Sequence, residues 1–295
     1  MRAVRNQAAA VARGLVWTSP WLVGFALFML VPIAMSIYYS LTDYTLLEGP
    51  VWVGLDNYRE LFGDRLFGVA IRNTLYFASV SVVGSTLLSI ALAMLLEQPL
   101  RGAGLVRAIV FVPVLVPIVS TCVCFLWLYN GQFGLINGVL ASVGISGPDW
   151  LGQRALAMPS IIIMSLWVIG SPVIIYAAAL KDVPAALYEA SDLDGVGSLG
   201  RFWHVTLPTI SPAVLFNGVM SLIWSMQIFA QPQIMTRGGP EHSTLAYSMY
   251  VYQNAFTYGR MGYASALSWV QILITLLMTA GLLVLARRLV HYRAA

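Results

Sequence analysis

Residues 264–286 read ASALSWVQILITLLMTAGLLVLA, a run of 23 residues that contains no charged side chain. A helix of about 20 apolar residues crosses the hydrocarbon core of a bilayer. The run is apolar on all sides, whereas a membrane-spanning β-strand alternates apolar and polar side chains over about 10 residues. This stretch therefore predicts a membrane-spanning helix.

Five more apolar runs precede it, at residues 14–40, 71–96, 106–129, 158–180 and 209–231. The 295 residues are 59% hydrophobic and only 9% charged, against about 25% charged in typical soluble domains. The first run is too long for the core of a signal peptide and lacks a small-residue cleavage site, so we expect it to be retained. Pro113, Pro117 and Pro172 are expected to kink the third and fourth runs. The fold class is therefore an all-α membrane protein with six transmembrane helices.

The domain organisation follows from the same runs. One six-span domain is expected at residues 14–290, between short cytoplasmic tails at residues 1–13 and 291–295. No other segment is long and polar enough to fold separately, and no clear internal repeat supports an inverted-repeat transporter. The fourth and fifth spans are joined by a loop at residues 181–208.

Charge placement predicts the topology. The 28 charged residues fall in loops or at the edges of runs, with ten basic residues on one side and six on the other. By the positive-inside rule both termini are cytoplasmic, in the inner membrane of a bacterium. The net charge of +4 then reflects topology and is no argument for nucleic acid. Cys122 and Cys124 do not share a helix face, so we interpret them as small hydrophobic residues.

The loop at residues 181–208 reads KDVPAALYEASDLDGVGSLGRFWHVTLP. Asp182 is a candidate N-cap and Pro184 suits the first turn of a helix. Gly195 can adopt the left-handed conformation that ends a helix. A second short helical piece is expected to follow and to end at Pro208.

The acidic side chains of this loop suggest a partner. Glu189 and Asp192 are expected to share a helix face and to be free to meet a cation. A helix of about ten residues is marginal alone, which favours docking against another chain. A solvated connecting helix is the alternative interpretation.

The loop resembles the EAA motif in permease subunits of binding-protein-dependent ABC importers. The matching residues are Glu189-Ala190-Ser191, Asp194-Gly195 and Leu207-Pro208, with Ser191 in place of a second alanine. Nearly the whole chain resembles the sugar branch related to maltose and glycerol-phosphate importers, and the first-subunit type in particular. Other stretches that carry this resemblance are Gly54-Leu55-Asp56-Asn57-Tyr58, Asn73-Thr74-Leu75 and Thr236-Arg237-Gly238-Gly239-Pro240.

The resemblance implies a cytoplasmic coupling helix between spans four and five that sits in a groove of an ATPase subunit. It implies a second permease, two ATPase subunits and an extracytoplasmic solute-binding protein as partners, within membrane lipid. The implied coupling residues are Glu189, Ala190, Ser191, Asp194, Gly195, Leu207 and Pro208.

The chain itself is not expected to be an enzyme. A phosphate-binding loop needs Gly-Lys-Ser/Thr, and the one lysine, Lys181, follows Leu180. ATP and Mg²⁺ are therefore expected in the partner ATPase, with no cofactor on this chain. His204, His242 and His291 lie far apart and indicate neither a metal site nor a catalytic triad.

The transported solute is expected to be small and uncharged, most simply a sugar. No charged side chain lies in the middle of a predicted span, so a buried ion would have no partner. A glycerol phosphodiester stays open if helix ends or a partner supply a positive field. The alternative role for the polar residues of spans four and five is to form hydrogen bonds between packed helices. The residues expected along the solute path are Trp167, Ser171, Tyr176, Asn217, Ser221, Trp224, Ser225 and Gln227.

Two other functions stay open at this point. An ATPase-independent secondary carrier or facilitator would be equally apolar. A membrane assembly or anchoring protein would need no solute path at all.

Overall fold

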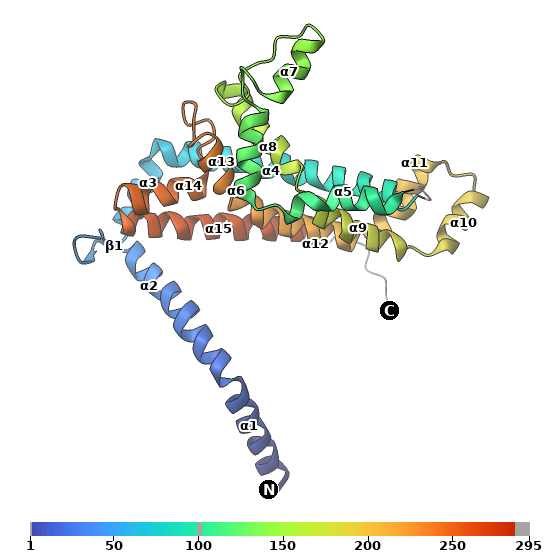
Figure 1. Cartoon of the computed structure of the whole chain (residues 1–295). Coiled ribbons are helices and arrows are strands. Elements are labelled where there is room, and N and C mark those ends of the chain that lie inside the picture. The colour runs from blue at the N-terminus through green and yellow to red at the C-terminus, as the bar shows by residue number, and fades with distance from the viewer. Residues whose placement is uncertain (1, 99–101, 287–295) are drawn as a thin grey trace. The chain divides into compact units, whose positions relative to one another are not determined.

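A computed structural model describes residues 2–98 and 102–286 (Figure 1). The described residues are mostly helical, with one two-stranded sheet, which confirms the predicted fold class. It divides into two compact units, one of Met1–Gly63 with Val251–Val270 and one of Asp64–Tyr250 with Gln271–Ala295. The predicted C-terminal tail at 291–295 lies outside the described residues.

The first unit begins with one long apolar rod. Helix α1 (Arg2–Phe25) continues through the π-helical turn η1 (Ala26–Leu30) into α2 (Val31–Ser40). Gly14–Ser40 is long and apolar enough to cross a membrane, as predicted. The backbone of the predicted tail at residues 2–13 belongs to the same helix.

After the rod, the first unit turns back in a small hairpin. Strands β1 (Thr42–Asp43) and β2 (Val51–Trp52) pair antiparallel. Helix α3 (Asp56–Gly63) follows. The start of α15 (Met261–Ala286) also belongs to this unit.

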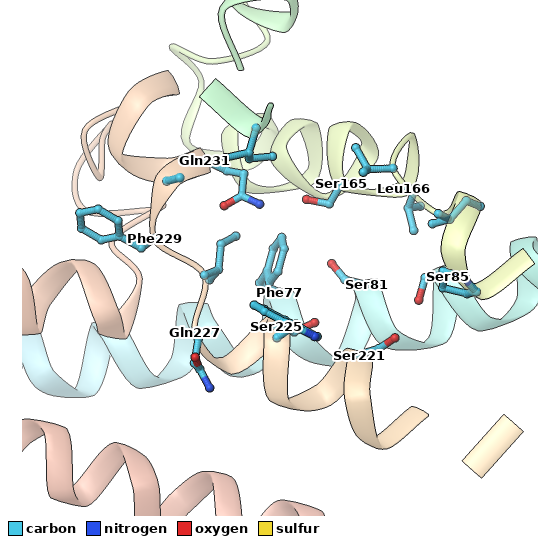
Figure 2. A pocket seen from close by; sticks show the side chains of 17 residues that line it. Phe77, Ser81, Ser85, Ser165, Leu166, Ser221, Ser225, Gln227, Phe229 and Gln231 are labelled. Carbon is cyan, nitrogen blue, oxygen red and sulfur yellow. The ribbon is translucent and has the colours of Figure 1, made fainter. Parts of the chain in front are cut away.

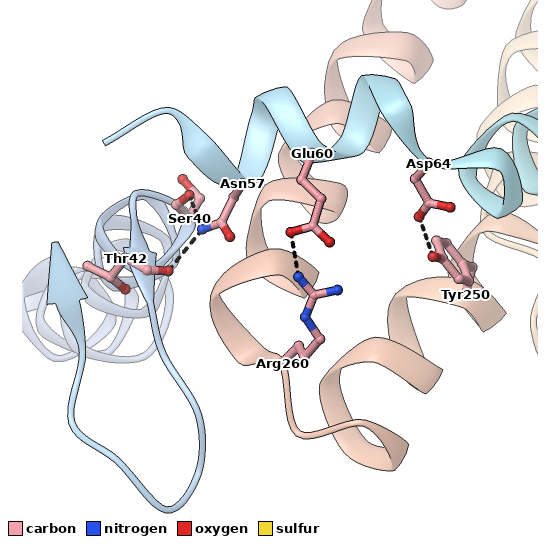
Figure 3. A network of polar contacts seen from close by, with 7 residues as sticks. All are labelled: Ser40, Thr42, Asn57, Glu60, Asp64, Tyr250 and Arg260. Atoms are coloured by element: carbon pink, nitrogen blue, oxygen red, sulfur yellow. Dashed lines mark hydrogen bonds and ion pairs between the residues drawn. The ribbon is translucent and has the colours of Figure 1, made fainter. Parts of the chain in front are cut away.

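A polar network fixes the end of α2 to α3 (Figure 3). The buried Asn57 side chain donates from Nδ2 to the carbonyl oxygens of Ser40 at 3.0 Å and Thr42 at 2.9 Å. Arg260 Nη2 lies 2.5 Å from Glu60 Oε2. These contacts hold segments that are far apart in the sequence.

Replacing Asn57 with alanine is expected to lower the stability of the first unit by about 1–3 kcal/mol, because two buried carbonyl groups lose their donor. The measurement is the thermal unfolding temperature of the purified protein. Arg59→Ala on the same helix is the control, since its ion pair with Asp56 is exposed and such pairs contribute about 0–1 kcal/mol. Equal shifts for the two variants would contradict this account of Asn57.

The second unit is built around α4 (Arg65–Leu96), which packs mainly against three other helices and touches α5 (Ala103–Leu115) as well. The three main neighbours are α8 (Arg154–Leu166), α9 (Gly170–Lys181) and α12 (Leu207–Met226). Across both units, the described residues form four unbroken helices that are long and apolar enough to span a membrane, and up to six spans if each of two bent helix pairs counts as one span. The six predicted spans thus correspond to these four helices and two pairs.

Both bends lie near the prolines that predicted them. Helices α5 (Ala103–Leu115) and α6 (Ile118–Leu128) meet at 103°, with Pro117 capping α6. Helices α8 and α9 meet at 49°. The break falls four residues before Pro172, where the proline ring would clash with a helical carbonyl. The predicted kinks in spans three and four are therefore confirmed.

The predicted helix end at Pro208 is wrong. Residues Ser198–Met226 form one continuous helix through α11 (Ser198–Arg201), the π-helical turn η2 (Phe202–Thr206) and α12. A π-helical turn before a proline widens the helix where the ring needs space. The hydroxyl of Ser211 donates to Pro208 O at 2.7 Å, a carbonyl that Pro212 cannot bond because it lacks an N–H.

The fifth span ends earlier than predicted. Helix α12 stops at Met226 instead of residue 231, and a separate helix, α13 (Ala230–Met235), follows. The predicted loops also hold helices, namely α7 (Leu135–Ser142) and α14 (Tyr247–Tyr252) with the π-helical turn η3 (Gln253–Thr257). Mean hydropathy does not record backbone direction, but Gln227, Gln231 and Pro232 stand at the break after Met226.

Candidate functional site

The loop after α9 forms a short helix, α10 (Ala185–Leu193), at one end of the second unit (Figure 1). Pro184 occupies the N-cap without a side-chain hydrogen bond. The predicted N-cap at Asp182 is wrong, because Asp182 is the C-cap of α9. A residue before proline avoids the helical region, so α10 begins only after Pro184.

The end of α10 matches its prediction. Gly195 has φ +70°, in the left-handed region. Its N–H donates to Asp192 O at 3.1 Å, and the next N–H, of Val196, donates to Ser191 O at 3.0 Å. This pair of bonds is the Schellman motif, which a glycine satisfies without strain.

One face of α10 is anchored to the core. Tyr188 packs against a buried cluster that includes Val183 and Ile210, and its hydroxyl lies 3.1 Å from Thr206 Oγ1. Ser191 is buried and its hydroxyl donates to Tyr188 O. Asp192 forms an ion pair with Arg201, so the expectation that it is free to meet a cation is wrong.

The opposite face of α10 is exposed. We call Ala186, Glu189, Ala190 and Leu193 the outer face, since they lie on one side at helical spacing and are all exposed. Leu193 is 90% exposed. Glu189 forms no ion pair with any residue that the structure describes. The outer face thus combines an exposed apolar side chain with a carboxylate that has no ion-pair partner among the described residues.

The predicted coupling residues separate into three groups. Glu189 and Ala190 lie on the outer face, and Asp194 and Gly195 are exposed where α10 ends. Ser191 faces the core. Leu207 and Pro208 are half-buried in the continuous helix that leads into α12, and Leu207 packs on the core cluster.

An ion-pair junction ties three helix ends beside this loop, and the sequence did not predict it. Glu97 caps the C-terminus of α4. Its Oε1 lies 3.2 Å from Arg107 Nη2 on α5 and 3.7 Å from Lys181 Nζ at the end of α9. The loop therefore starts from a point where α4, α5 and α9 are linked.

Replacing Gly195 with valine is expected to weaken the end of α10. A residue other than glycine in the left-handed region costs about 1–2 kcal/mol of conformational free energy, and the β-branched side chain of valine raises this cost. The transport activity that the resemblance implies should fall while the amount of chain in the membrane stays the same. Gly197→Ala is the matched control, because Gly197 has φ −65° and open space around it. Normal uptake by the valine variant would contradict a role for this helix end.

A second candidate site is a pocket of about 450 Å³ in the second unit (Figure 2). Three helices, α4, α8 and α12, supply most of its polar side chains. Ser81 of α4 and Ser165 of α8 point toward one another across it, with Gln231 nearby. The polar residues that line it are Ser81, Ser85, Ser165, Ser221, Ser225, Gln227 and Gln231.

The pocket lies where helices are interrupted. Ile118 follows the break between α5 and α6. Val168 and Ile169 form the break between α8 and α9, and Gln227 and Ile228 the break between α12 and α13. Broken helices at membrane depth are tolerated where they line a cavity.

Four of the eight predicted solute-path residues line this pocket, namely Ser221, Trp224, Ser225 and Gln227. The other four do not. Tyr176 and Asn217 are buried, and Ser171 is exposed outside the pocket. Trp167 packs against Phe125, with ring centroids 5.6 Å apart.

The α4 residues of the pocket were not predicted. Ser81 and Ser85 follow Phe77 at steps of four, so two hydroxyls share one helix face inside an apolar run, a pattern that could have been recognised. Ser81 Oγ is buried without a hydrogen-bond partner among the described residues. Burying such a hydroxyl is unfavourable unless something else bonds it.

The pocket can bind a neutral polar molecule. The described residues that line it carry no charge, and they include five serines, Gln231, Gln227 and Trp224. The amide of Gln227 points away from the other labelled side chains (Figure 2). Aromatic faces with hydroxyl and amide groups are suited to an uncharged, hydrogen-bonding solute.

Comparison with known proteins gives consistent matches. Residues 85–291 match the family of the binding-protein-dependent transport system inner membrane component. The chain is 34% identical to the probable ABC transporter permease protein YesP of Bacillus subtilis, over 95% of this chain and 92% of the relative. It is 34% identical to the lactose transport system permease protein LacF of Rhizobium radiobacter, over 88% and 89%.

Among solved structures, the fold is similar to a chain of the bacterial alginate ABC transporter in complex with an alginate pentasaccharide-bound periplasmic protein. The TM-score is 0.81 with 22% identity, over 97% of this chain and 96% of that chain.

Proposed function

Since this chain belongs to the family of binding-protein-dependent transport system inner membrane components, we propose that it forms half of the path by which an ABC importer carries a small uncharged solute, a sugar, into the cell. The observation that carries the solute class is the uncharged pocket of hydroxyls, amides and Trp224. A relative named for lactose, an uncharged sugar, supports this solute class.

The outer face of α10 is the proposed coupling surface. It would sit in a groove of an ATPase subunit, with Glu189 meeting a basic side chain and Leu193 an apolar one. Tyr188 and the ion pair of Asp192 with Arg201 join α10 to the helix that leads into α12. Movement of α10 would therefore reach α12, whose other end lines the pocket.

The remaining parts of the proposal concern partners and placement. A second permease would complete the solute path, two ATPase subunits would bind ATP and Mg²⁺, and a solute-binding protein would deliver the sugar. The six-span domain at residues 14–290 would lie in the inner membrane with both termini cytoplasmic. Family membership favours this assembly over an ATPase-independent carrier or an anchoring protein.

The test is uptake by the reconstituted complex across a panel of labelled sugars and glycerol phosphodiesters. Uptake of one sugar that requires the ATPase, ATP and the solute-binding protein is the expected result. Uptake that persists without the ATPase, or that is limited to a phosphodiester, would contradict the proposed mechanism or the proposed solute class respectively.

A further inference from the structure

A third pocket, of about 890 Å³, lies in the second unit where α4 and α8 begin. Three arginines line it, Arg65 and Arg72 from α4 and Arg154 from α8. Arg154 Nη1 lies 3.1 Å from Glu241 Oε2, in an exposed ion pair. Arg65 and Arg72 are exposed and form no ion pair within the described part of the chain.

The rim of this pocket is held in place. Asn73 Nδ2 donates to His242 O at 2.8 Å and to Leu245 O at 3.1 Å, so α4 fixes the segment that follows Pro240. Glu241 and His242 both have positive φ, of 48° and 59°. Such backbone strain in residues other than glycine persists only where surrounding contacts impose it. The segment that lines the pocket opposite the arginines is therefore held in one conformation by its contacts with α4.

The exposed face of α4 continues from the arginines into apolar sequence. Arg72, Tyr76, Val80, Val83 and Leu87 follow at steps of four or three, which places them on one helix face, and all five are exposed. The part from Tyr76 to Leu87 rises about 16 Å, close to the roughly 15 Å of hydrocarbon in one leaflet.

We propose that this groove binds an anionic phospholipid of the leaflet that surrounds the starts of α4 and α8. Guanidinium groups bind phosphate oxygens through paired N–H donors. Arg65 and Arg72 would hold the phosphate, and an acyl chain would lie along Val80, Val83 and Leu87. An acidic protein surface would use the arginines alone, so the apolar continuation favours a lipid.

The test measures lipid retention by the full chain with its co-purifying partners. The protein is placed in nanodiscs of equal phosphatidylglycerol and phosphatidylcholine, and retained lipid is counted by native mass spectrometry. Wild type is expected to retain phosphatidylglycerol selectively. Arg65→Gln with Arg72→Gln should retain it about 30-fold less well. Arg59→Gln, an exposed arginine outside the pocket, should behave as wild type.

Two further arms separate the alternatives. Soluble glycerol phosphate should not displace the lipid, and displacement would indicate a site for a free phosphate group. If the glutamine variant fails to fold, Arg65→Lys with Arg72→Lys keeps the charge without the paired donors and should still weaken retention several-fold. Equal retention of the two lipids by wild type would overturn the proposal. So would arginine variants that keep the lipid but lose the solute-binding protein.

Discussion

Glu189→Lys is expected to reduce ATP-driven uptake at least about 30-fold. The carboxylate lies on the outer face of α10 with no ion-pair partner among the described residues. In the assembled importer it would be buried against a cation, and losing one member of such a pair costs about 2–5 kcal/mol. Charge reversal adds repulsion. Uptake by vesicles and retention of the ATPase during purification are the two measurements.

The control for this variant is Glu48→Lys, which reverses an exposed acidic residue between β1 and β2. It should keep uptake and ATPase retention close to wild type. The Glu189 variant should reach the membrane in normal amounts, because an exposed side chain contributes little to folding. Normal transport by Glu189→Lys would show that the outer face is not a coupling surface.

Trp224→Ala is expected to raise the KM for the solute about 30-fold, corresponding to about 2 kcal/mol for an aromatic side chain central to a binding site. Trp224 lines the pocket and is 69% exposed. Removing its indole should therefore change solute affinity far more than stability. KM from initial uptake rates and the thermal unfolding temperature would together separate these effects.

Trp167→Ala is the matched control, since Trp167 is also an exposed tryptophan of the second unit but does not line the pocket. From the sequence alone, both Trp167 and Trp224 are expected along the solute path. A larger effect on KM at Trp167 than at Trp224 would place the solute elsewhere.

The six spans could be predicted because each is a long apolar run, and hydropathy reports that directly. Their breaks could be predicted only where a proline marks them, as at Pro117 and Pro172. The break after Met226 falls four residues before Pro232, the same spacing as the break before Pro172, so this proline could have predicted it as well. Pro208 predicts a helix end that does not occur, because a π-helical turn before it lets the helix continue.

In the candidate sites, too, some features could be predicted from the sequence and others could not. Gly195 was identified correctly because only its left-handed conformation ends α10 without strain. The sequence does not predict which face of α10 is buried. Tyr188 and Ser191 face the core, and Tyr188 contacts Thr206, a residue distant in the sequence. Ser81 lies outside the predicted solute path because that prediction rests on the fourth and fifth spans, while α4 also lines the pocket.

The most direct test of the coupling account is cysteine crosslinking in the assembled complex. Leu193→Cys is made in a chain with Cys122 and Cys124 replaced by alanine, and Leu47→Cys, at a position 97% exposed between β1 and β2, is the control. The account predicts a crosslink from position 193 to the ATPase subunit and none from position 47. An assembled, active complex in which position 193 fails to reach the ATPase would contradict it.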